Sequence, residues 1–211
     1  MIVQMSASLS LRAARLVGNR DAGLAAGIAT TDLVGVTIEA TAPREFDQTG
    51  GSGAWFASDT TASLVASVLR GNRGVALVAD KSKVQARGLV VLTTKEGVFK
   101  EVDIKGIFTG KTTSLADGIL LNASPNSALD RCLLAGNGRA GILFESSPGA
   151  AVTRTLIDAS QGQYGLVLQH TEDALDQANS IFGATQANRA SDAGLSLPQA
   201  PEPLMKGDGA G

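Results

Sequence analysis

A nine-residue phrase recurs along most of this chain and limits the folds that are open to it. The phrase reads aliphatic, two variable residues, small, variable, aliphatic, variable, Gly, Asn, and its clearest copies are residues 11–19, 64–72 and 129–137. Weaker copies begin at Leu33, Val84, Val102 and Val152, so successive copies start 18 to 31 residues apart. Self-similarity at this spacing predicts a repeat architecture, in which each unit buries its apolar face against the next one.

Two positions of the phrase are aliphatic in all seven copies. The first position holds Leu11, Leu33, Leu64, Val84, Val102, Leu129 and Val152, and the sixth holds Leu16, Ile38, Leu69, Leu89, Ile107, Leu134 and Ile157. Hydrophobic residues make up only 44% of the composition, so chance does not account for this agreement. We therefore predict that both positions point into one shared core.

A second phrase, Gly-aliphatic-x-aliphatic, follows most copies, at residues 74–77, 118–121, 141–144 and 165–168. Alternation with a period of two, punctuated by Gly, Asn and Pro, predicts short strands. Asn19, Asn72 and Asn137 end the three clearest copies of the first phrase. Asn tolerates a left-handed backbone, so we expect these residues at sharp turns between strands.

Together the two phrases resemble the right-handed parallel β-helix of the pectate-lyase-like superfamily. The residues that carry the resemblance are 129–137 leading into 141–144, with 147–152 opening the next unit. The resemblance covers about residues 8–185 and implies an all-β solenoid of about seven to eight coils. It is specific for the fold and not for an activity.

The organisation of the chain follows from where the phrases stop. We predict one β-helix domain over residues 1–190 and a flexible Pro/Gly-rich tail over residues 191–211. Residues 41–52 and 110–117 are expected to protrude as loops, and residues 171–190 could start a short helix that caps the last coil. The pattern begins almost at the first residue, which favours a segment of a longer β-helix. Such a segment would expose an uncapped coil and associate end to end.

Composition and charge exclude several classes of protein. A formal net charge of -2 argues against a nucleic-acid-binding domain, and one His and one Cys exclude a His/Cys zinc site or a disulfide framework within the chain. No signal peptide is visible in residues 1–10, and no apolar run approaches the ~20 residues of a membrane span. Only the resemblance indicates where the protein is located, and it implies the extracellular space or the cell envelope.

The superfamily includes polysaccharide lyases and hydrolases, so charged columns on the outside of the coils are candidate sites. Asp103 and Asp130 share the second position of the phrase, and Arg131 and Arg154 share the third. Paired carboxylates could bind Ca²⁺ or act as general acid and base, and an arginine could bind uronate carboxylates or abstract a proton. The alternative is a solvated surface of ion pairs, which is the usual state of exposed charges and is the interpretation we favour.

Other polar residues have a structural interpretation beside the chemical one. Asp117 precedes a glycine, as in β-helix glycosidases, but the match is only two residues long and favours a turn. His170 is expected at a strand end on the surface, and Cys132 as a small inward residue. Arg87 and Lys105 fall at the same inward position as Cys132, where two buried cations would be prohibitive. Either the register shifts there, or the strands bend so that both side chains reach solvent.

Three aromatic residues, Phe46, Trp55 and Phe56, lie in and around the longest predicted loop. They could stack on sugar rings or pack against the coils, and packing is favoured. The favoured function is a non-catalytic module of a secreted or cell-surface protein that binds glycans or envelope material. The alternative is a lyase or glycoside hydrolase acting on acidic polysaccharide. No cofactor is expected for the favoured function, and Ca²⁺ is expected only for the alternative.

Overall fold

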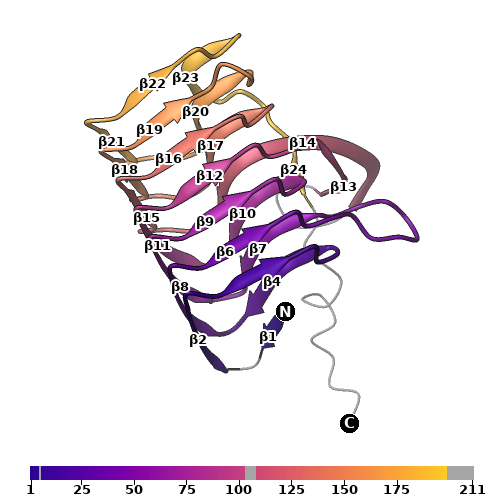
Figure 1. Ribbon diagram of the computed structural model, residues 1–211. Helices are drawn as coiled ribbons and strands as arrows, with labels where there is room; N and C mark the ends of the chain where they lie inside the picture. Colours follow the sequence, from indigo (N-terminus) through magenta and orange to yellow (C-terminus); the bar gives the residue numbers. More distant parts are fainter. Residues whose placement is uncertain (5, 103–107, 199–211) are drawn as a thin grey trace.

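Three parallel β-sheets run the length of the molecule in a computed structural model that describes residues 1–4, 6–102 and 108–198 (Figure 1). Sheet A contains β1 (Ile2–Gln4), β4 (Ala22–Gly27), β7 (Ser52–Ala57), β10 (Gly74–Asp80), β14 (Phe108–Asn122), β17 (Ala140–Glu145), β20 (Tyr164–Gln169) and β23 (Ala187–Ser191). Sheet B contains β2 (Ser8–Arg12), β5 (Thr30–Val34), β8 (Thr61–Val65), β11 (Lys83–Arg87), β15 (Ala128–Asp130), β18 (Ala151–Thr153) and β21 (Leu175–Gln177). Sheet C contains β3 (Arg15–Val17), β6 (Thr37–Glu39), β9 (Val68–Arg70), β12 (Val90–Leu92), β16 (Leu133–Ala135), β19 (Leu156–Asp158) and β22 (Ser180–Phe182).

The chain passes from sheet B to sheet C to sheet A and then starts the next coil. Each strand therefore pairs in parallel with its equivalent one coil further on, and sheets B and C have seven strands each. The result is a right-handed parallel β-helix of seven coils within the described residues, as the two phrases predict. Two strands lie outside the coils: β13 (Gly97–Val102) pairs antiparallel with β14, and β24 (Leu197–Pro198) pairs antiparallel with β13.

The core is built from aliphatic columns that run from coil to coil. One column in sheet B is aliphatic over the first six coils and contains Leu11, Leu33, Leu64, Ala86, Leu129 and Val152. One column in sheet C is aliphatic in all seven coils and contains Leu16, Ile38, Leu69, Val91, Leu134, Ile157 and Ile181. Between the first and last coils, the side chains of these columns are fully buried. Five of the seven predicted copies, those starting at Leu11, Leu33, Leu64, Leu129 and Val152, are thereby confirmed.

The other two copies were wrong. Val84 lies two residues before the column position, which Ala86 occupies, because two residues in a strand return to the same face. Val102 belongs to the antiparallel hairpin β13–β14 and opens no coil. Since a hairpin strand alternates with the same period as a coil strand, alternation could not separate them. Asp103, Lys105 and Ile107 lie outside the described residues.

Each corner between sheets B and C turns on one residue with a left-handed backbone. Between sheets B and C these residues are Ala13, Gly35, Ala66, Gly88, Arg131, Arg154 and Ala178, with φ between 47° and 63°. Hydrogen bonds between coils support the corners: the Ser124 amide donates to Ser147 Oγ at 3.0 Å, and the Thr41 amide donates to Asn72 Oδ1 at 3.1 Å. In the fourth coil, Thr94 Oγ1 donates to Asn137 Oδ1 at 2.7 Å.

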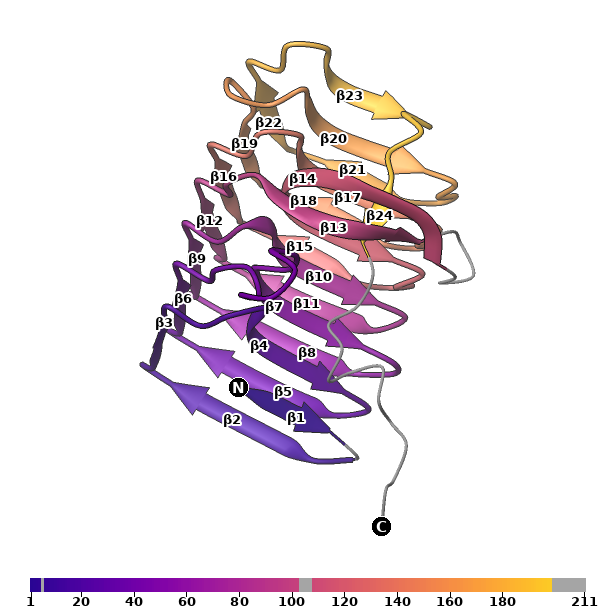
Figure 2. The same cartoon turned by 90° about the vertical axis from the view of Figure 1, so that its right-hand side faces the viewer.

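The end of the chain differs from its sequence prediction. No helix forms within the described residues, and residues 171–190 instead contribute β21, β22 and β23, which make the seventh coil. Residues 193–198, which we name the strap, then run back across the outer face of sheet A and end in β24 (Figure 2). The strap was expected to be part of a flexible tail but is packed; residues 199–211 of that tail lie outside the described residues. No helix in the described part of the chain is long and apolar enough to cross a membrane.

The strap and the hairpin cover a second apolar cluster on the outside of sheet A. Its central column in the sheet is Trp55, Val78, Leu120, Leu143 and Val167. Phe99 and Leu115 of the hairpin and Leu197 of the strap complete this cluster. Trp55 and Phe56 are both buried, on opposite faces of β7, so packing is confirmed for them; Phe46 is 74% exposed.

Candidate functional site

The predicted charges at the corner between sheets B and C do come together. Asp130 ends β15, and Arg131 and Arg154 hold the left-handed corner positions of the fifth and sixth coils. Asp130 Oδ1 accepts hydrogen bonds from Thr153 Oγ1 at 2.9 Å and from Arg154 Nε at 2.8 Å. Arg131 Nε lies 4.0 Å from Asp130 Oδ2. The corner is therefore one carboxylate between two guanidinium groups.

These contacts fix the ionisation of Asp130. Partial burial raises the pKa of this carboxyl. The hydrogen bonds from Arg154 and Thr153 and the nearby guanidinium charges lower the pKa by more than burial raises it, so the net pKa lies below its usual value. Asp130 is an anion at neutral pH and is poorly suited to give up a proton as a general acid.

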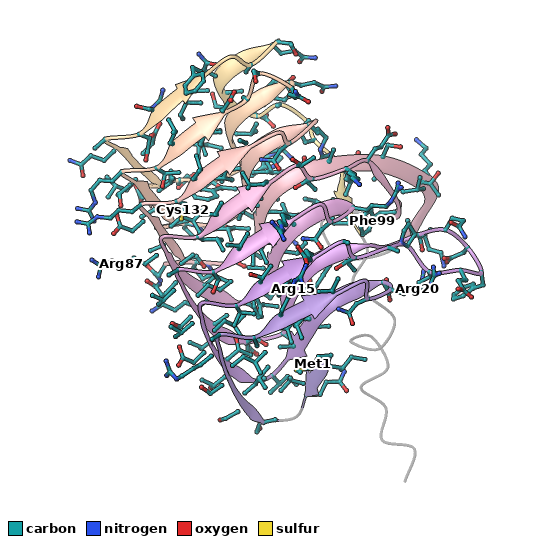
Figure 3. All side chains as sticks on the ribbon, viewed as in Figure 1. Met1, Arg15, Arg20, Arg87, Phe99 and Cys132 are labelled. Atoms are coloured by element: carbon teal, nitrogen blue, oxygen red, sulfur yellow. The ribbon has the colours of Figure 1, made fainter. Side chains whose placement is uncertain are left out.

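Asp103, the other carboxylate of the predicted pair, lies outside the described residues, so the pairing stays a prediction. The coil neighbours of Asp130 are Arg87 on one side and Thr153 on the other. Arg87 points away from the coils (Figure 3), which confirms the predicted register shift. Within the described residues, no group of three or more His, Cys, Asp or Glu side chains could hold a metal ion. The corner has the form of a surface ion cluster.

The other polar residues singled out by sequence have structural partners. Asp117 is fully buried and accepts a hydrogen bond from Arg139 Nε at 2.8 Å, which makes a buried ion pair rather than the expected turn. His170 is 58% exposed, as expected for a strand end, and its Nδ1 lies 2.9 Å from Glu145 Oε1. Cys132 is buried, as expected, and burial raises the pKa of its thiol to about 11, so the thiol is protonated and unreactive at neutral pH.

Sequence reasoning missed a groove at the corner between sheets C and A, with a volume of about 460 Å³. It is lined by Thr93, Thr94, Lys95, Glu96, Ser114, Leu115, Ala116, Gly136, Gly138, Arg139, Gln161 and Gln163. These residues come from the fourth, fifth and sixth coils, and the base of the hairpin forms one wall. The available signal was the gap between Val102 and Leu129, where residues 110–117 were expected to protrude, but it did not indicate the groove beside them.

The groove has a fixed backbone and a polar lining. The Lys95 amide donates to the Asn72 carbonyl at 2.8 Å, and the Gln163 amide donates to the Arg139 carbonyl at 3.1 Å. Arg139 is held by Asp117 and by the Ser196 carbonyl of the strap, at 3.0 Å. The side chains of Lys95, Glu96, Gln161 and Gln163 are exposed. Hydroxyl, amide and oppositely charged side chains therefore line a groove whose backbone is hydrogen-bonded from coil to coil.

Comparison with known proteins adds little to this geometry. No protein family and no curated protein matches the sequence. Three solved structures of QnrB1, a plasmid-mediated fluoroquinolone resistance protein, are similar to this chain over most of its length. A trypsin-treated variant has 14% identity, covers 90% of this chain and 92% of its own, and has a TM-score of 0.25. The full-length form has 15% identity, coverage of 93% and 98%, and a TM-score of 0.22. The sheet topology itself establishes this chain as a right-handed parallel β-helix.

Proposed function

We propose that this chain is a non-catalytic β-helix module of a secreted or cell-surface protein, and that it binds a glycan in the groove between sheets C and A. The observation that carries the proposal is the polar lining of that groove on backbone segments from three coils. The pectate-lyase-like superfamily is the proposed relationship, supported by the three parallel sheets and the short left-handed corners between them.

The chemistry of the lining favours a neutral polysaccharide. A sugar chain presents hydroxyl groups, which both donate and accept hydrogen bonds. Gln161 and Gln163 can do both through their amides, and Thr93 and Ser114 through their hydroxyls. The charges of Lys95 and Glu96 offset each other, and the buried Asp117 offsets the charge of Arg139, so the groove has no net attraction for a uronate chain. Its volume of about 460 Å³ lies within the range of small-ligand sites.

The ion cluster at Asp130 supports the non-catalytic half of the proposal. Its carboxylate is engaged by Arg154 and Thr153, and none of the three residues lines the groove. A polysaccharide held in the groove would therefore not reach it. The pairs Asp117–Arg139 and Glu145–His170 are likewise engaged within the fold.

The test is affinity electrophoresis through gels that contain neutral or acidic polysaccharides, followed by size-exclusion chromatography of each polymer after incubation with the protein. We expect one neutral polymer to retard the protein and to remain at full length, with Ca²⁺ or with chelator. A double variant, Gln161→Ala with Gln163→Ala, should weaken retention about tenfold, because each lost hydrogen bond contributes ~0.5–1.5 kcal/mol.

Gln177→Ala is the matched control, because Gln177 is an exposed glutamine of β21 on sheet B, outside the groove. The control should bind as the wild type does. Equal loss in the control and the double variant, or no retention by any polymer, would refute the groove. Shortened polymers would refute the non-catalytic assignment and make Asp130→Ala the next variant.

A further inference from the structure

The outer face of sheet C carries an apolar stripe that neither apolar cluster of the described residues includes. Val68, Val90, Leu133 and Leu156 form one column along β9, β12, β16 and β19. Leu92 and Ala135 form part of a second column beside it. These side chains are half-buried, except for Leu156, which is 40% exposed.

Sheet C differs from the other two sheets in what lies on its outer face. The outer face of sheet A is covered by the strap and the hairpin. The outer face of sheet B is polar over its first four coils, where its central column is Ser10, Asp32, Ser63 and Gln85. That column continues with Ala128, Ala151 and Leu175, two of which are only single methyl groups. An exposed apolar stripe that continues over four coils marks an interaction surface.

Opposite charges stand at the two ends of the stripe. On the N-terminal side, Glu39 of β6 is bound by both Arg15 and Arg70, so this end carries one net positive charge. The side chain of Arg70 is still 52% exposed. On the C-terminal side, Asp158 of β19 lies in the same column as Arg70 and accepts a hydrogen bond from the Ser160 amide at 3.0 Å.

This distribution is complementary to itself. A two-fold axis parallel to the strands, placed between β12 and β16, turns the stripe over and reverses the order of the coils. It puts Val90 of one copy opposite Leu133 of the other, and Val68 opposite Leu156. Arg70 then lies opposite Asp158, so that both ends of the stripe meet an opposite charge. A surface patch that matches its own rotated copy is what an isologous dimer interface requires.

We propose that the outer face of sheet C is the contact surface of a side-by-side, antiparallel homodimer. The two faces pack as aligned sheets about 10 Å apart, as in a β-sandwich. The stripe is about four coils long, or ~19 Å at 4.8 Å per coil, and three residues wide. This footprint is well below the ~800 Å² per partner of a standard interface, so the dimer is weak and forms at protein concentrations on the order of 100 µM.

The test is chemical cross-linking between engineered cysteines in a Cys132→Ala background, which removes the single native thiol. A bis-maleimide of about 8 Å reach suits opposed sheets, whose Cα atoms are too far apart for a disulfide. A mixture of Val68→Cys and Leu156→Cys proteins should give a covalent dimer, because the two positions face each other. Either variant alone should give several-fold less, because two copies of one position lie three coils, or ~14 Å, apart along the stripe.

A second measurement needs no cysteine. Sedimentation equilibrium should show a concentration-dependent dimer in the wild type, and Leu133→Glu should weaken it at least tenfold because it places two carboxylates in the contact. Gln85→Glu, which adds the same charge on sheet B, is the control and should leave the dimer unchanged.

Three results would overturn the proposal. The first is a wild-type protein that stays monomeric up to about 1 mM. The second is a dimer that forms equally well with Leu133→Glu, which would place the contact elsewhere, such as at the coil ends. The third is equal cross-linking of the mixture and of each single variant. Loss of polysaccharide binding in Leu133→Glu together with a wild-type monomer would assign the stripe to a ligand instead.

Discussion

Adjacent leucines on opposite faces of one strand allow a direct test of the coil register. Leu134 of β16 points inward, is fully buried, and lies between Val91 and Ile157 of the neighbouring coils. Leu133 precedes it, points outward and is half-buried. Leu134→Ala and Leu133→Ala therefore remove the same atoms, the first from the inner face of the sheet and the second from its outer face.

The two substitutions should differ severalfold in cost. Leu134→Ala removes three buried carbon atoms at about 0.8 kcal/mol each, which gives ~2.4 kcal/mol. A residual cavity on the order of 40 Å³ adds about 1 kcal/mol at ~24 cal/mol per Å³. We expect a total of about 3.4 kcal/mol. Leu133→Ala leaves no cavity, since water already reaches the site, and should cost less than about 1 kcal/mol.

Urea denaturation at low micromolar protein is the assay, with circular dichroism and the fluorescence of Trp55 as two probes. Trp55 is the only tryptophan of the chain and lies in the second coil, three coils from Leu134. Coincident transitions by both probes would show that the coils unfold together and that the difference in free energy is well defined. Equal losses in the two variants, or a loss below 1 kcal/mol for Leu134→Ala, would refute the assigned register.

Three further predictions concern buried and paired groups. Asp117→Asn should cost about 3 kcal/mol in urea denaturation, because it leaves the Arg139 guanidinium without its buried anion; a loss below 1 kcal/mol would contradict a desolvated pair. Cys132 should resist a thiol reagent at pH 8 in the native protein and react on unfolding, and the raised pKa should lower the melting temperature of the wild type, but not of Cys132→Ala, between about pH 9 and 11. Burial raises the pKa of Asp176, but the hydrogen bond from Arg189 helps to lower it by a larger amount, so the net shift is downward. The pair then stabilises the fold above about pH 4 and is lost in acid, and the melting temperature of Arg189→Gln should approach that of the wild type as the pH falls below this value.

The coil fold could be predicted from sequence because its core positions repeat without exception where the coils are regular. Leu33, Leu64 and Leu129 occupy one column because each must fill the same space above its predecessor. The prediction failed where a different structure has the same period. Val102 alternates with its neighbours as a coil residue would, yet it pairs antiparallel in the hairpin. A period of two reports a strand but not its partner.

The candidate sites were less predictable, for a related reason. Asp130 and Arg154 could be placed at one corner because both belong to the regular phrase. Gln161 and Gln163, which line the groove, follow the sheet C strand of their coil in a connecting segment without a pattern. A groove also needs the hairpin as its wall, and the position of that wall depends on pairing between segments far apart in sequence. Loop residues of this kind gain their meaning only from the scaffold that positions them.

The two ends of the coil stack differ chemically, and this difference bears on how copies can meet. Leu9, Leu11 and Leu16 point inward in the first coil but are only half-buried. In the seventh coil, the equivalent inward column of sheet B holds Asp176, which pairs with Arg189 at 2.5 Å.

Head-to-tail stacking would press this ion pair against the leucines and remove its water, which costs more than the pair regains. The contact through sheet C desolvates mainly aliphatic side chains and brings Arg70 toward Asp158 at its rim, where water still reaches both. Asp176 interrupts the aliphatic column in the last coil, and its ion pair with Arg189 therefore opposes linear growth from that end. Lateral pairing of two copies is the association with the lower desolvation cost.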